Sequence, residues 1–100
     1  MARLDVHPMP GRARGYVLNV QTDLLSYLGT RVVVTLLPQA EIPMPIKDLN
    51  PIFEIVGQPH VMVTQAIATV PAKEIRQVIT SLNHLHDEII RALDILLTGI

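Results

Sequence analysis

The sequence contains neither cysteine nor tryptophan, and only 3% of its residues are aromatic. The absence of cysteine excludes disulfide bonds and thiolate chemistry. The first residues lack the apolar segment of a secretion signal, and no apolar run approaches the length needed to span a membrane. We therefore expect a cytoplasmic protein.

An excess of charge of either sign is also absent, because 8 Lys and Arg residues oppose 9 Asp and Glu residues. A protein that binds DNA directly usually carries a broad positive surface, so we expect no direct contact with nucleic acid. The N-terminal region is nevertheless locally basic, since it contains Arg3, Arg12, Arg14 and Arg31 against Asp5 and Asp23. Such a cluster is typical of a solvated loop, and the alternative is a site for an acidic partner.

Aliphatic residues, in contrast, are abundant. Hydrophobic residues make up 49% of the chain and charged residues 17%. A chain of 100 residues supports one core, so residues 1–100 are predicted to form a single domain. Its interior is too small for so much aliphatic surface, which predicts an interface between subunits, most simply that of a twofold homodimer.

Three strands are predicted in the first part of the chain. Residues 3–8 (RLDVHP) alternate polar and apolar side chains, which places His7 on the polar face of a half-buried strand. Residues 15–21 (GYVLNVQ) show a similar alternation, while residues 31–37 (RVVVTLL) are apolar on both faces and β-branched, as in a central strand. We expect the three to pair in an antiparallel sheet.

The middle of the chain is predicted to hold a loop followed by a hairpin. Four prolines between Pro38 and Pro51 exclude a regular helix or a central strand there. Two apolar segments, residues 51–56 and 60–67, then flank the turn signal GQP.

From Ile75 onward, apolar residues recur at helical spacing, and we expect an amphipathic helix with a break near Asn83. Asn83 is the candidate N-cap, and Asp87 and Glu88 fall in the early turns, where the helix dipole favours anions. The final apolar residues are expected either to dock on the body of the protein or to be offered to a partner, with Gly99 allowing close approach or a left-handed exit.

Motifs for catalysis or cofactor binding are not found. GRARG does not follow a strand into a helix, so it is no phosphate loop, and Ser26 and Ser81 lack the glycines of a nucleophile elbow. His84 and His86 would point about 200° apart on a helix, which is unsuitable for one metal ion. We expect no catalytic residue, no cofactor and no metal.

Several segments, in their order and spacing, resemble the CcdB family of plasmid-type toxins. They are LNVQTDLL, GTRVVVTL, the hairpin, ATVPAKEI and the closing ALDILLTGI, which together run nearly end to end. The resemblance implies a mostly β fold, a small SH3-like barrel with an antiparallel sheet and a C-terminal helix, assembled as a twofold dimer. It also implies a binding function rather than an enzymatic one: family members poison DNA gyrase by gripping its A subunit while the DNA is cleaved. A CcdA-like antitoxin with a disordered tail neutralises them.

The resemblance also implies which residues bind. The gyrase-contacting positions would be Leu24, Leu25, Asp94, Leu97, Thr98, Gly99 and Ile100. For the antitoxin, the local positive charge predicts that Arg12 and Arg14 bind an acidic segment. At position 98 the family carries a tryptophan that stacks on an arginine of gyrase, and this chain has threonine. Three interpretations follow: a gyrase poison, a homologue that retains only antitoxin binding, and a ribonuclease of the MazF type.

Overall fold

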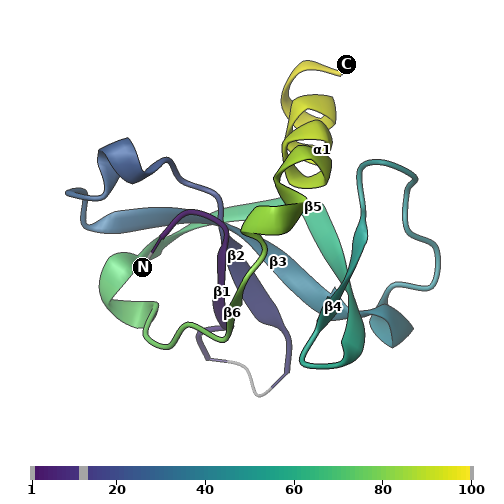
Figure 1. The fold of residues 1–100 in the computed structure, drawn as a ribbon, viewed down its shortest axis with the longest axis horizontal. Helices are drawn as coiled ribbons and strands as arrows, with labels where there is room; N and C mark the ends of the chain where they lie inside the picture. Colours follow the sequence, from purple (N-terminus) through teal and green to yellow (C-terminus); the bar gives the residue numbers. More distant parts are fainter. Residues whose placement is uncertain (1, 12–13, 100) are drawn as a thin grey trace.

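The computed structural model, which describes residues 2–11 and 14–99, is a curled antiparallel sheet with a helix packed at one end (Figure 1). The sheet has the strand order β4-β5-β3-β2-β1-β6 and is nearly closed into a barrel. Its strands are β1 (Asp5–Pro8), β2 (Tyr16–Asn19), β3 (Thr30–Pro38), β4 (Ile52–Ile55), β5 (Gln58–Pro71) and β6 (Thr80–Ser81), and the helix is α1 (His86–Thr98). The expected mostly β, SH3-like barrel is confirmed.

Strand β3 lies at the centre of the sheet, between β2 and β5. Val34 and Leu36 point into the main core, while Val33 belongs to a second, smaller cluster with Val17 and Ile75. Both faces of β3 are therefore covered, which confirms the central strand expected from its continuous apolar run.

Strand β5 serves both halves of the barrel because its pairing with β3 breaks in the middle. Val34 pairs with Ile67 but the next residue, Thr35, pairs with Val63, so three residues of β5 are left out of the ladder. One of them, the fully buried Thr64, donates a hydrogen bond to the Leu49 carbonyl at 2.5 Å. Such an irregularity bends a strand and increases its twist, which curls the sheet at β5.

The expected helix is wrong for residues 75–82, which run alongside β1 instead, and is confirmed after the break near Asn83, where α1 covers His86–Thr98. The Ile79 amide donates to the Val6 carbonyl and the Leu82 amide to the Leu4 carbonyl, both at 2.8 Å. Pairing with the free edge of β1 and burial of the apolar side chains override the helical spacing.

The helix start was also misassigned. Asn83 opens a short 3-10 helix (η4, Asn83–Leu85) and does not cap α1; its own amide donates to the Ser81 hydroxyl at 3.2 Å. His7, expected on the polar face, is fully buried, and its Nδ1 donates to the Gln77 carbonyl at 2.8 Å. A hydrogen bond to the segment that covers β1 makes this burial tolerable.

The C-terminal helix α1 packs on the barrel through Ile89, Ala92 and Leu93. Asp87 and Glu88 occupy its first turn as expected. Gly99 takes the left-handed conformation (φ 77°), and its amide donates to the Asp94 and Ile95 carbonyls, which confirms the left-handed exit. No helix in the described part of the chain has the length and apolar character to cross a membrane.

The predicted hairpin is formed by β4 and β5 and turns at Val56 and Gly57, between the paired Ile55 and Gln58. Both turn residues have positive φ, 51° for Val56 and 74° for Gly57, as two-residue hairpin turns require. A β-branched residue is strained in this conformation, and Val56 is 71% exposed, so its side chain gains little from packing.

Replacing Val56 by Asn should therefore stabilise the protein. We expect Val56→Asn to raise the free energy of unfolding by about 1 kcal/mol, because asparagine tolerates the left-handed region that valine avoids. Urea unfolding followed by circular dichroism measures the change, with Val56→Ala as the control that removes the branch alone. A midpoint for Val56→Asn no higher than that for Val56→Ala would contradict this account.

Candidate functional site

Two groups of exposed apolar residues project from the barrel. The first is the loop that contains the 3-10 helix η1 (Asp23–Leu25) and joins β2 to β3. Leu24 is 85% exposed and Tyr27 78% exposed, while Leu25 and Leu28 are each 38% exposed. Leucines at such exposure in a small loop are unusual in a monomer surface and favour a role in binding.

Local polar contacts hold η1 in shape. Thr22 precedes it and accepts a hydrogen bond from the Leu24 amide on its side-chain oxygen, at 3.3 Å. The Asp23 carboxylate accepts one from the Arg3 amide at 2.9 Å, which ties the loop to the segment before β1. The loop thus presents Leu24 on an ordered turn.

The buried Arg31 closes this loop from inside. It is 8% exposed, and its guanidinium donates to three carbonyls: Leu28 and Thr30 through Nη1 at 2.6 and 2.8 Å, and Ser26 through Nη2 at 2.8 Å. The carbonyls of a loop that forms no regular strand pairs lack backbone donors. The Arg31 guanidinium supplies the missing hydrogen bonds to these three carbonyls.

Gln21 completes the closure. Its side chain donates to the Leu25 carbonyl at 3.1 Å and accepts from the Val32 amide at 3.1 Å. Arg31 and Gln21 are therefore positioning residues for the exposed leucines. Neither residue was predicted to have this role, and Arg31 was grouped with the locally basic residues. The one sequence signal for Arg31 is a charged residue at the start of an apolar strand.

The second projection is the end of α1. Leu97 is 71% exposed, and Asp94, Thr98 and Gly99 are exposed beside it. The Thr98 hydroxyl donates to the Asp94 carbonyl at 2.7 Å, so it satisfies a carbonyl of the last turn. Ile100 lies outside the described residues. The apolar end was expected either to dock on the body of the protein or to be offered to a partner. The exposure of Leu97 favours contact with a partner.

The two projections do not meet within one copy of the chain. Figure 1 shows η1 leaving the barrel on the side of β2 and β3, whereas α1 rises from a different edge and points away. The residues expected to contact gyrase are thus divided between two places, Leu24 and Leu25 at one and residues 94–99 at the other.

The predicted basic site is only partly available. Arg3 is half-buried and donates through Nε to the Val20 carbonyl at 3.3 Å, and Arg31 is buried as described, so neither is a fully exposed cation. Arg14 is exposed and forms an ion pair with Glu41 at 2.5 Å. Arg12 lies outside the described residues.

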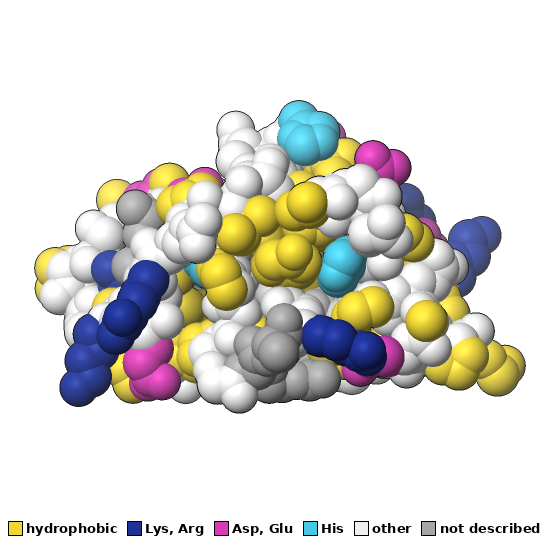
Figure 2. All heavy atoms as spheres, turned by 90° about the horizontal axis from the view of Figure 1, so that it is seen from below, with side chains coloured by type: hydrophobic (Ala, Val, Ile, Leu, Met, Phe, Trp, Pro, Cys, Tyr) yellow, Lys and Arg dark blue, Asp and Glu magenta, His cyan; other side chains and the backbone are white. Residues whose placement is uncertain are grey.

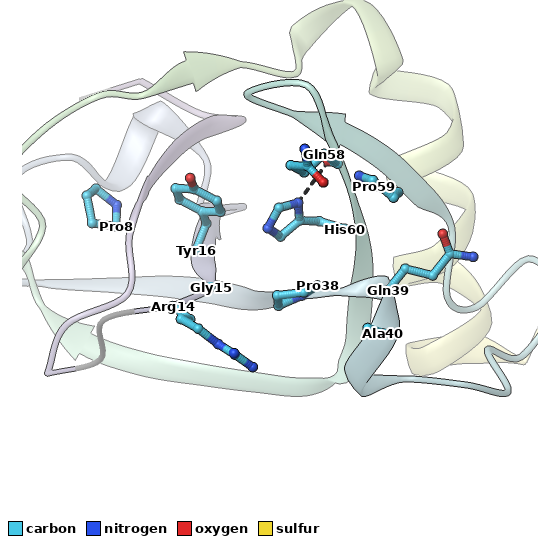
Figure 3. Close-up of a pocket in the computed structure, with 10 residues that line it drawn as sticks. All are labelled: Pro8, Arg14, Gly15, Tyr16, Pro38, Gln39, Ala40, Gln58, Pro59 and His60. Carbon is cyan, nitrogen blue, oxygen red and sulfur yellow. Dashed lines mark hydrogen bonds between the residues drawn. The ribbon is translucent and has the colours of Figure 1, made fainter.

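Arg14 also lines a pocket of about 500 Å³ that sequence analysis did not predict (Figure 3). The pocket lies between the ends of β1 and β3 and the starts of β2 and β5, and its other lining residues are Pro8, Gly15, Tyr16, Pro38, Gln39, Ala40, Gln58, Pro59 and His60. Figure 2 shows the underside of the view in Figure 1, where hydrophobic side chains gather at the centre with basic side chains on both sides. These residues are scattered over the sequence, and only the strand register brings them together.

Comparison with known proteins gives one clear result. The family model described as CcdB protein matches residues 3–99 of this chain. A search of curated proteins gives no match.

Removing the Arg31 side chain should loosen the η1 loop. We expect Arg31→Gln to lower the free energy of unfolding by about 2–4 kcal/mol, because buried carbonyls lose their donor. Limited digestion with chymotrypsin should also cut within residues 22–29 faster than in the wild type. The matched control is the exposed Arg76→Gln, for which we expect a change of less than about 0.5 kcal/mol. Equal stability and digestion of both variants would show that Arg31 does not hold the loop.

Proposed function

The chain belongs to the CcdB family, and from this premise we propose that it is the toxin of a toxin–antitoxin pair that binds the A subunit of DNA gyrase through its two apolar projections. Family membership itself implies a toxin with a gyrase-related function. What we propose beyond family membership is the target, the A subunit of gyrase, and the residues of this chain that contact it. It acts in this proposal as a binding protein in the cytoplasm and not as an enzyme.

The observation that carries the proposal is the exposure of Leu24 and Leu97. Both stand at positions that the family resemblance assigns to gyrase contact, and they are 85% and 71% exposed. Burying a leucine side chain contributes about 1.5–3 kcal/mol, so two such residues in each copy form the apolar centre of an interface. Asp94 and Thr98 lie beside Leu97 and supply the polar rim.

We propose a twofold dimer, which the separation of the two projections supports. One copy presents them at different edges, so a single binding face that contains both requires residues of two copies. The exposed apolar residues of the barrel support an interface between copies, since Ile52, Ile67 and Val78 are 43%, 38% and 48% exposed. Twofold pairing is the commonest way in which such surfaces are covered.

We expect sedimentation equilibrium at micromolar concentration to give twice the chain mass of 11.1 kDa. The physical reason is the exposed aliphatic surface, which a dimer removes from water. A species of single-chain mass that persists at all concentrations would refute the dimer.

The antitoxin belongs to the same proposal. Arg14 is exposed near one end of the barrel, and together with Arg12 it is proposed to bind an acidic segment of a CcdA-like antitoxin. Such rim charges raise association rates and make them salt-dependent, more than they raise affinity.

The ribonuclease alternative receives little support. RNA cleavage needs an acid, a base and a phosphate-stabilising group in one cleft. In the described residues the pocket at Arg14 is lined by one imidazole, that of His60, and by no carboxylate, so it lacks an acid and base pair. The Thr35 hydroxyl donates to the Ala66 carbonyl, and Thr35 does not line this pocket.

Variants at residue 98 test whether the chain is a gyrase poison or a homologue that retains only antitoxin binding. Thr98 is exposed and its hydroxyl donates to the Asp94 carbonyl of its own helix, so a larger side chain there fits without disturbing the core. We expect Thr98→Trp to bind the gyrase A subunit about tenfold more tightly than the wild type, because an indole adds apolar area and a cation–π contact.

A binding titration with the gyrase A subunit measures this effect, and Thr98→Val is the control that removes the hydroxyl without adding an aromatic ring. Plasmid cleavage by whole gyrase in the presence of each variant then reports poisoning. If Thr98→Trp binds no better than Thr98→Val, residue 98 does not face gyrase in this protein.

A further inference from the structure

The pocket at the end of the barrel is formed by residues at the ends of strands. Its volume of about 500 Å³ is within the range of pockets that hold small ligands or single side chains. Gly15 lies on its wall with φ 90°, and a Cβ atom there would come within 3.2 Å of the Leu36 carbonyl oxygen. The backbone thus approaches the barrel at a place where other residues do not fit, and this approach sets the positions of Arg14 and Tyr16.

Rings and prolines form the apolar part of the pocket wall. Tyr16 and His60 make an edge-to-face contact with ring centroids 5.1 Å apart. Pro8, Pro38 and Pro59 supply the other apolar surfaces. Prolines and aromatic rings together favour a flat ring as the occupant, because such rings stack with little loss of conformational entropy.

His60 adds a polar atom with a defined role. Its Nδ1 lies 2.9 Å from the Gln58 carbonyl oxygen, which only accepts hydrogen bonds, so Nδ1 carries the hydrogen (Figure 3). In the neutral imidazole the other nitrogen, Nε2, is then an acceptor. Its hydrogen bonds within the described residues do not involve Nε2. A ring that carries an N–H donor, as an indole does, matches this atom.

Arg14 supplies the charge at the rim. It contacts Glu41 through Nη2 only, which leaves Nη1 and Nε without a hydrogen bond in residues 2–11 and 14–99. The Arg14 side chain is 69% exposed, so the ion pair contributes little stability and does not prevent contact with a second carboxylate. A guanidinium has donors enough for both.

We propose that this pocket binds a tryptophan side chain flanked by carboxylates, presented by an acidic peptide segment. The indole ring enters between the prolines and the Tyr16 ring and donates to His60 Nε2, while a neighbouring carboxylate binds Arg14. The assignment of this segment to the antitoxin rests on the proposed function, whereas the chemistry of the pocket is independent of it.

The test exploits the absence of tryptophan from the chain. The probe is acetyl-Asp-Trp-Glu-amide, and its matched neutral probe is acetyl-Asn-Trp-Gln-amide. The anisotropy of indole emission is followed while wild-type protein is added. We expect saturable binding of the acidic probe, about fivefold tighter than that of the neutral one.

Two variants locate the binding. Ala40 is exposed and lines the pocket from the 3-10 helix η2 (Gln39–Glu41), so Ala40→Phe should fill the entrance and weaken binding of the acidic probe about tenfold or more. Ala40→Ser keeps the pocket open and should bind as the wild type does. Arg14→Gln should remove the preference for the acidic probe, whereas Arg76→Gln, with the same charge change, should preserve it.

Absence of binding to the wild type, or equal binding to wild type and Ala40→Phe, would overturn the proposal. Circular dichroism of each variant confirms that the fold is intact. Binding of the gyrase A subunit is measured on the same samples: a protein that binds gyrase but no probe keeps the proposed function and loses this site. A protein that binds the probe but not gyrase keeps this site and loses the proposed function.

Discussion

The bend in β5 is the constraint on which the rest of the structure depends. Three residues of this strand leave the ladder between the Thr35–Val63 and Val34–Ile67 pairs, and Thr64 is held at the bend by the Leu49 carbonyl. Asn50, from the same loop as Leu49, adds a hydrogen bond from its side chain to the Met62 carbonyl at 3.1 Å. The first half of β5 pairs with β4 on one edge and with β3 on the other, and it contributes His60 to the pocket, while the second half pairs with β3. The bend adds twist to β5, and this twist lets a small sheet curl until it is nearly closed.

The projections depend on this closed body but are built by different means. The η1 loop has few backbone pairs, and buried polar side chains, Arg31 and Gln21, supply the missing ones. The end of α1 instead extends past the surface that Ile89 and Leu93 bury, so Leu97 and Thr98 are exposed while Ile95 and Leu96 are half-buried. In both places the core supplies rigidity and leaves leucine side chains in water, which costs free energy unless a partner covers them.

The strands and the general fold could be predicted from local pattern, because β-branched runs and proline-bounded loops report directly on strand pairing. Residues 75–82 could not, since their spacing of apolar residues fits a helix as well as it fits an irregular strand, and the free edge of β1 decides between them. The exposure of Leu24 and Leu97 agrees with positions taken from the family resemblance, but nothing in the spacing of apolar residues separates them from core leucines. The pocket residues lie at the ends of four strands, and the register that unites Tyr16 with His60 is a tertiary property.

The central claim is that the η1 loop and the end of α1 act together on one target. The direct measurement is a titration of the gyrase A subunit with Leu24→Glu, Leu97→Glu and, as the control, Met44→Glu, whose side chain is 86% exposed on a loop outside both projections. The account predicts that each of the first two variants loses about tenfold or more in affinity while Met44→Glu binds as the wild type does. Equal affinity for all three variants, or a loss confined to one projection, would contradict it.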